Sequence, residues 1–212
     1  MDEKVYNKLK EFEKDGIKLR EVASWAVWDK DNINNLKIID EKIDKLKDDI
    51  VFVGLNFSRE TPDWENWKNF HCDSFADKRL RDLLSGTKYE GAYMTDLIKN
   101  YHNADPEEAI KNFKLDEAKR KIDIDFLFKE IDLLGKENIE MYLFGKDVEW
   151  LFDKFVREHE NFKTFKQKII KCQRIHHFSS QVTDFEVIAS VQLGLSNKTD
   201  QLVKKWKYDP LW

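Results

Sequence analysis

The chain has little of three residue types that shape many small proteins: 7 glycines, 3 prolines and 2 cysteines among 212 residues. So few glycines and prolines disfavour a turn-rich all-β sandwich and a low-complexity linker protein. Cys72 and Cys172 are too few for a four-cysteine zinc or iron–sulfur site within one chain, and we expect no metal and no cofactor. Two reduced thiols are typical of a cytoplasmic protein.

The sequence also lacks long apolar runs and an excess of positive charge. No apolar stretch reaches the roughly 18 residues that span a bilayer, and residues 1–15 are too charged for a signal peptide, so we expect no membrane partner. The 37 Lys and Arg against 41 Asp and Glu give a net charge of −4. This balance argues against binding of nucleic acid by global positive charge and leaves room for a local basic groove.

The sequence does have an alternation of strand-like and helix-like segments. Apolar strand-like runs occupy residues 50–54, 91–97 and 139–144, and a fourth run ends near residue 175. Helical patterns cover residues 2–15, 36–48, 77–84, 105 onward, 123–134, 145–158 and 184–193. We predict one domain over residues 1–212, an α/β three-layer α/β/α fold with a central four-stranded parallel sheet and an N-terminal helical extension over about residues 1–48.

Particular residues support the helix boundaries. Gly16 is expected to end the first helix, and Gly135 a later one. Asp105 and Pro106 have the chemistry of a helix start, with an acceptor cap followed by proline. Charged residues within the helix at 77–84 are expected to form ordinary surface pairs; they are Asp77, Lys78, Arg79, Arg81 and Asp82.

The residues just after each predicted strand should converge, because ligands of parallel sheets bind beyond the carboxyl ends of the strands. Residues 54–58, 95–99, 145–147 and 176–180 occupy these positions. Together they supply a carboxamide, a carboxylate, hydroxyls, an aromatic ring and two imidazoles. Adjacent histidines in an extended chain point in opposite directions, so at most one of His176 and His177 faces the shared cleft.

The four turns resemble motifs of the uracil-DNA glycosylase superfamily. Residues 53–58 read Val-Gly-Leu-Asn-Phe-Ser and look like its first motif, closest to the Gly-x-Asn-Pro form of the mismatch-specific branch. Residues 91–99 and 141–146 are similar to its second and third strands, and residues 177–179 (His-Phe-Ser) stand where its second catalytic motif, a His-Pro-Ser type loop, is found. The motifs follow in family order over roughly residues 48 to 195.

The resemblance implies a reaction and a set of roles. The reaction is hydrolysis of an N-glycosidic bond after the base has been flipped out of the duplex. Asn56 would orient the attacking water and His177 would stabilise the departing base. The residues implied to bind the base are Phe57, Phe70, Asp96 and Ser179, with Phe75 as another candidate for the stacking ring. The residues implied to bind phosphate are Ser58, Lys99, Lys146 and Arg174.

Two departures from the family pattern bear on the substrate. Asn56 cannot act as a general base, because its amide takes up no proton near neutral pH. An ionised Asp96 cannot donate a hydrogen bond and would repel a carbonyl oxygen of uracil, so it favours an exocyclic amino group such as that of cytosine or a purine. Phe57 and Phe178 also replace the prolines of the two catalytic motifs.

Two other hypotheses stay open from the sequence. The fold could be kept without catalysis, so that the cleft binds a free nucleotide, a nucleoside or a protein partner. Alternatively, an N-terminal region rich in tryptophan could be an interaction surface, although indoles at helical spacing often form a buried face; these residues are Trp25, Trp28, Trp64 and Trp67. DNA remains a candidate partner if Lys99, Lys146 and Arg174 form a positive rim.

Overall fold

The computed structural model describes residues 1–57, 66–99, 101 and 105–193. Its centre is a five-stranded sheet in the order β3-β5-β4-β6-β7. The strands are β3 (Ala23–Trp25), β4 (Lys47–Asn56), β5 (Ala92–Ile98), β6 (Ile139–Phe144) and β7 (Ile169–Ile175). The last four run parallel, as predicted, and the prediction of four strands is corrected by β3, which pairs antiparallel with β5 at the edge.

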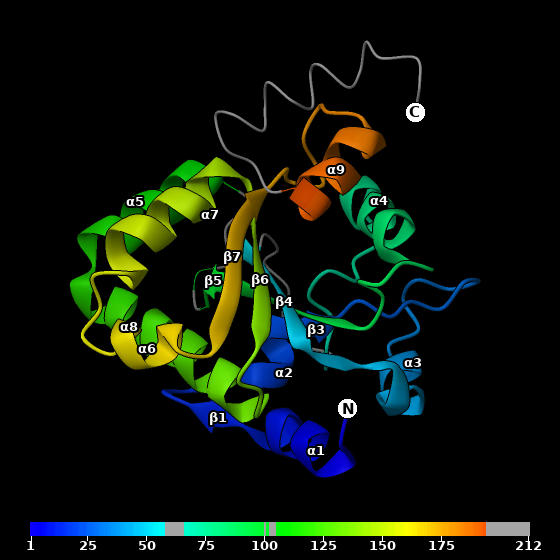
Figure 1. Cartoon of the computed structure of the whole chain (residues 1–212), viewed down its shortest axis with the longest axis horizontal. Helices are drawn as coiled ribbons and strands as arrows, with labels where there is room; N and C mark the ends of the chain where they lie inside the picture. Colours follow the sequence, from blue (N-terminus) through cyan, green and yellow to red (C-terminus); the bar gives the residue numbers. More distant parts are fainter. Residues whose placement is uncertain (58–65, 100, 102–104, 194–212) are drawn as a thin grey trace.

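Helices cover both faces of this sheet (Figure 1). On one face lie α5 (Pro106–Leu115), α6 (Glu117–Leu133) and α7 (Gly145–Leu151), with α8 (Phe162–Lys166) and the π-helix Phe152–Val156 following α7. On the other face lie α4 (Phe75–Leu84) and α9 (Asp184–Leu193). Alternation along β4 explains the two apolar cores, because Val51 and Val53 face the first group of helices and Phe52 the second. The predicted α/β class is therefore confirmed.

The N-terminal region differs from its prediction at Gly16. Helix α1 (Glu3–Glu11) ends before this residue, and the chain then forms a two-stranded ribbon of β1 (Glu13–Lys14) and β2 (Ile17–Lys18). Asp15 and Gly16 have φ of 54° and 77°, the left-handed values that a two-residue hairpin turn requires. Asp-Gly is a strong hairpin signal, so Gly16 closes a hairpin and does not end the helix.

Other boundaries were predicted with mixed success. The single helix expected at residues 36–48 is divided into α3 (Lys37–Glu41) and a 3₁₀ turn (Ile43–Lys45), and β4 already begins at Lys47. The start of α5 is confirmed, since Asp105 accepts a hydrogen bond from the Glu107 amide at 2.9 Å. The short helix α2 (Leu19–Val22) leads directly into β3. Within the described residues no helix is both long and apolar enough to cross a membrane.

Candidate functional site

A cavity of about 320 Å³ lies at the carboxyl ends of β4 and β5. Six of the residues singled out in the sequence line it: Asn56, Phe57, Phe70, Asp96, His177 and Ser179. They come from the end of β4, from β5, from the segment before α4 and from the loop after β7. The parallel sheet brings these separate turns to one place, as expected of its carboxyl edge.

Asp96 is buried at the base of this cavity, next to Gly54 on the neighbouring strand. A Cβ atom on Gly54 would overlap Asp96 Oδ1 and approach Cζ of Phe70 to 3.3 Å. On its other oxygen, Asp96 accepts a hydrogen bond from Asn69 Nδ2 at 2.8 Å. Glycine at position 54 is therefore what allows a carboxyl group to lie against β4 here.

Burial changes the expected protonation of Asp96. Desolvation raises its pKa from 3.8 to about 7, against the opposing effects of the Asn69 hydrogen bond and the Lys99 charge. Asp96 is therefore not fully ionised near neutral pH, contrary to what was expected from the sequence. Near neutral pH the side chain populates both forms, so it donates a hydrogen bond when protonated and only accepts when ionised.

The segment that carries Asn69 is held by backbone groups of the N-terminal region. The Trp67 amide donates to the Arg20 carbonyl at 2.6 Å, and Ser24 Oγ donates to the Trp67 carbonyl at 2.7 Å. Asn69 Nδ2 also donates to the Val22 carbonyl at 3.0 Å. The predicted N-terminal extension thus supports the cavity wall from behind, because it sets the position of the Asn69 side chain.

Backbone strain accompanies this anchoring. Trp67 and Phe70 have φ of 66° and 64°, in the left-handed region that large side chains rarely adopt. Such strain persists only where the surroundings impose it, and it is frequent at ligand sites. Here it turns the Phe70 ring into the cavity, while the Trp28 indole donates to the Phe70 carbonyl at 3.4 Å.

The described tryptophans of the N-terminal region do not form an exposed surface. Trp25 and Trp67 are fully buried and Trp28 nearly so, which contradicts the hypothesis that they form an interaction face. Trp64 lies outside the described residues. The Trp67 indole donates to the Tyr6 hydroxyl at 2.9 Å and thereby connects α1 to the cavity wall.

Asn56 lies at the end of β4 with its amide orientation set by the backbone. Its Nδ2 atom donates to the carbonyls of Tyr101 at 3.2 Å and Phe57 at 3.4 Å. The other end of the amide is a carbonyl oxygen, which can accept a hydrogen bond from a water molecule. This is the contact that the resemblance assigned to Asn56.

His177 is neutral in this structure. Its Nδ1 accepts a hydrogen bond from the Ser179 amide at 3.1 Å and lies 2.6 Å from Ser179 Oγ, so its proton is on Nε2. Burial lowers its pKa to about 4, against the opposing charge of Asp147. The ring stacks on Phe178 with centroids 4.3 Å apart. A neutral imidazole that donates through Nε2 suits stabilisation of negative charge on a leaving group.

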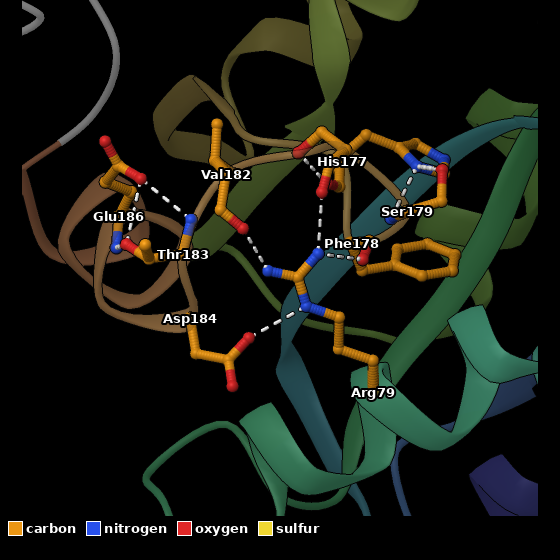
Figure 2. Close-up of polar contacts among 9 residues, drawn as sticks. Arg79, His177, Phe178, Ser179, Val182, Thr183, Asp184 and Glu186 are labelled. Atoms are coloured by element: carbon orange, nitrogen blue, oxygen red, sulfur yellow. Dashed lines mark hydrogen bonds and ion pairs between the residues drawn. The ribbon is translucent and has the colours of Figure 1, made fainter.

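The loop after His177 is held by Arg79 of α4 (Figure 2). The guanidinium donates to the carbonyls of Phe178 at 3.0 Å, Ser180 at 2.7 Å and Val182, and it pairs with Asp184 at 2.8 Å. The single guanidinium group of Arg79 thus holds both ends of this loop together. The expected surface pairing of this arginine within α4 is wrong.

A second cavity of about 670 Å³ adjoins the first and shares Leu55, Pro106, His177 and Ser179 with it. Lys146 and Arg174, two of the predicted phosphate-binding residues, line this larger cavity. Lys146 is exposed, and Arg174 contacts Glu149 at 3.2 Å. His177 lines both cavities and His176 the larger one only, so both adjacent histidines face the larger cavity.

The other two predicted phosphate-binding residues are not at these cavities. Ser58 lies outside the described residues. Lys99 is fully buried, with Nζ 2.5 Å from Glu130 Oε1 and in contact with Thr95 Oγ1, so its assignment to the rim is wrong. Side chains alternate along an extended chain, which places Thr95 and Lys99 on the α6 side and Asp96 on the opposite side.

Sequence reasoning missed Asn69, Asp77 and Cys72, which also line the smaller cavity. The positions of Asn69 and Cys72 depend on the path of the segment between β4 and α4, which has no periodic pattern. Asp77, expected at the helix surface, is buried in the first turn of α4. A signal for Asp77 does exist, since Ser74 Oγ caps its amide at 3.0 Å and the Ser-x-x-Asp spacing marks a helix start. His71, next to Cys72, is also buried, and its Nε2 lies 3.0 Å from the Trp25 carbonyl.

Within the described residues, no group of three His, Cys, Asp or Glu side chains could hold a metal ion. The fold places the chain among α/β proteins with a mostly parallel sheet and a cavity at its carboxyl edge. Comparison of the sequence with protein-family models and with curated proteins gives no match.

Gly54→Ala tests the packing of Asp96 against β4. We expect it to lower the free energy of unfolding by about 1–3 kcal/mol, as overpacking in a core does. Because the overlap is with Asp96, the same substitution should cost less in an Asp96→Ala background. Urea denaturation of the two single variants and the double variant measures this coupling, and strictly additive effects would contradict the contact.

Asp96→Asn tests the raised pKa. Between pH 3.8 and about 7 the folded chain keeps a proton on Asp96 that the unfolded chain has lost, so the contribution of Asp96 to stability falls as pH rises through this range. The asparagine variant stays neutral, so its Tm relative to wild type should rise by several degrees from pH 4 to pH 7 and then level off.

Thermal melts of both proteins across this range measure the difference. The comparison cancels the opposite effect of His71 and His177, whose lowered pKa values of about 4 add stability as pH rises toward 6.5. Asp73→Asn, at an exposed carboxylate, is the matched control. A Tm difference for Asp96→Asn that does not change with pH would refute the shift.

Arg79→Met tests the loop contacts in Figure 2. One charge-assisted hydrogen bond is worth about 1.5–3 kcal/mol, so hydrogen exchange of amides at residues 177–184 should accelerate by at least about tenfold. Arg81→Met is the control, because the Arg81 side chain contacts the adjacent Asp82 at 2.9 Å. Equal protection of the loop in both variants would show that Arg79 does not hold it.

Proposed function

We propose that this chain has the uracil-DNA glycosylase-like fold and is a DNA glycosylase-like protein of the cytoplasm. It binds a flipped nucleobase in the 320 Å³ cavity and hydrolyses the N-glycosidic bond of a damaged or mispaired base. One observation carries the proposal: Asn56, Asp96 and His177, from three different turns, line one cavity of this size together with the Phe70 ring. Three of the four turns that resemble the family motifs thus contribute to one cavity, which supports the proposal.

The geometry supports a dissociative hydrolysis. Water attacks the anomeric carbon as the bond to the base nitrogen breaks, and the electron pair of that bond passes to the base. The Asn56 carbonyl oxygen orients the water, while the neutral His177 donates its Nε2 proton as a hydrogen bond to the departing base. The proton released by the water ends on the base, and the sugar keeps a hydroxyl group.

The larger cavity supports the proposal, because it offers a place for the sugar and phosphates of the flipped nucleotide. It adjoins the base cavity at His177 and Ser179 and carries the cations Lys146 and Arg174. Phosphate contacts of such residues position a nucleic acid without reading its sequence. The base cavity would hold the ring and the larger cavity the backbone of the flipped nucleotide.

A second candidate function has one observation in its favour. Lys99 is paired with Glu130 in the core, so fewer of the described cations lie at the rim of the cavities than the sequence predicted. With a net charge of −4, this favours a catalytically inactive protein that binds a free nucleoside or nucleotide in the same cavities. Salt dependence separates the two, because each neutralised phosphate of duplex DNA contributes a slope of about −0.9 to log K against log salt.

Single-lesion oligonucleotides carrying uracil, hypoxanthine, xanthine or an alkylated base test the proposal. We expect an abasic product from at least one of them, and about 10²–10³-fold slower cleavage by His177→Ala, the usual cost of losing one donor to a developing anion. Asn56→Ala should also be slow, whereas Asn112→Ala on α5, away from both cavities, should cleave normally.

Absence of product on every lesion would reject catalysis. Cleavage by Asn56→Ala that matches wild type would reject Asn56 as the residue that orients the water. Binding of a free nucleoside without cleavage, together with DNA affinity that barely depends on salt, would establish the second candidate.

A further inference from the structure

Asn69 offers the base cavity a hydrogen-bond acceptor that has no donor among the described residues. The side chain lines the cavity and is buried, with 4% of the residue exposed. Its Nδ2 donates to the Val22 carbonyl at 3.0 Å and to Asp96 Oδ2 at 2.8 Å, which uses both hydrogens of the amide nitrogen. The carbonyl oxygen Oδ1 is therefore the part of this amide that is left for a ligand.

The amide of Asn69 cannot reverse its orientation. A flipped side chain would place Oδ1 against the Val22 carbonyl, so that two acceptors would face each other. The backbone beside it is fixed as well, because the Trp67 amide donates to the Arg20 carbonyl and Ser24 Oγ donates to the Trp67 carbonyl. The acceptor is thus held in one position before any ligand arrives, as specific recognition requires.

The apolar surroundings make an unpaired acceptor costly. Phe57, Phe70 and Phe178 are buried and line the cavity, and the rings of Phe70 and Phe178 are 6.3 Å apart. A planar ring that fills a cavity of about 320 Å³ displaces the water that could otherwise donate to Asn69. An acceptor that loses water and gains no donor costs free energy, and this cost is larger in a medium of low dielectric constant. The ligand itself must then supply the donor.

The neighbouring Asp96 cannot make the same selection at every pH. Its Oδ2 already accepts from Asn69, and its pKa of about 7 means that the carboxyl group is partly protonated near neutral pH. It can donate when protonated and only accepts when ionised. The amide of Asn69 does not titrate, so its oxygen is an acceptor throughout this range.

We propose that Asn69 determines the specificity of the cavity, by accepting a hydrogen bond from a ring N–H or amino group on the pairing edge of the base. Bases that lack this donor, or are alkylated there, fill the cavity and leave the acceptor unpaired, so they bind poorly. This inference rests on the proposed function for the kind of ligand and not for the hydrolysis. It concerns a residue that the motif resemblance did not single out.

Two pairs of base analogues without a glycosidic bond test this recognition by calorimetric titration. 1-Methyluracil and 1,3-dimethyluracil differ in the ring N–H, and 9-methyladenine and 9-methylpurine differ in the amino group. In at least one pair we expect the probe with the donor to bind at least about tenfold more tightly, because its partner leaves a buried acceptor unpaired. The ratio should be the same at pH 6 and pH 8, whereas a ratio set by Asp96 would change with its protonation.

Asn69→Leu keeps the approximate size of the side chain and removes the acceptor. We expect it to weaken the probe with the donor by about tenfold and to leave the other probe nearly unchanged, so that the ratio approaches one. Asn112→Leu on α5, away from both cavities, is the matched control and should preserve the ratio. The wild-type ratios decide the inference even if Asn69→Leu does not fold.

The outcomes separate this inference from the proposed function. Equal binding within both pairs, no binding of any probe, a ratio that is present at pH 8 and lost at pH 6, or an unchanged ratio in Asn69→Leu overturns the inference. Selective binding of a probe with the donor, without cleavage of any lesion oligonucleotide, supports the inference and rejects the hydrolysis. Cleavage of a lesion oligonucleotide without selectivity between the probes supports the hydrolysis and overturns the inference.

Discussion

The cavity depends on one constraint, the burial of the Asp96 carboxyl group between Gly54 and Asn69. A carboxyl group taken out of water must find hydrogen-bond donors, and Asn69 supplies one. Asn69 in turn is held by the Val22 carbonyl, so a polar group on β5 determines where the segment before α4 must run. This requirement explains why a short stretch with two left-handed residues, Trp67 and Phe70, is tolerated in a packed region.

The charged side chains of and around β5 lie in two separate networks, one on each face of this strand. On the α6 side, Lys99 and Glu130 form a fully buried pair in which Thr95 and the Tyr93 hydroxyl, at 2.7 Å from Glu130, complete the hydrogen bonding. A buried pair of this kind adds little net stability, but removing one partner leaves an uncompensated charge. On the opposite side, Asp96 faces the cavity. Because the strand separates the two networks, Lys99 does not reach the cavity, and the described residues that line it include no lysine.

Two long-range contacts make the site a product of distant segments. The N-terminal region holds Asn69 and Phe70, and Arg79 of α4 holds the loop that presents His177. Both use backbone carbonyls as acceptors, but in different ways: the loop after His177 is held through its own carbonyls, whereas the segment before α4 is held partly through the Asn69 side chain. A neutral imidazole, an oriented amide and a carboxyl group with a pKa of about 7 meet as a result.

The sequence by itself determined the four parallel strands, most of the helices packed on them, the carboxyl edge as the place of the site, and most of the residues that line the cavity. Apolar periodicity and post-strand position are local properties, and residues such as Asn56, Asp96 and His177 follow from them. Only the tertiary structure decided the role of Asn69, the reach of Arg79, the burial of Lys99 and the protonation of Asp96. Each of these depends on which segments pack together and on how much water they exclude. Neither property can be predicted from the spacing of residues along one helix or strand.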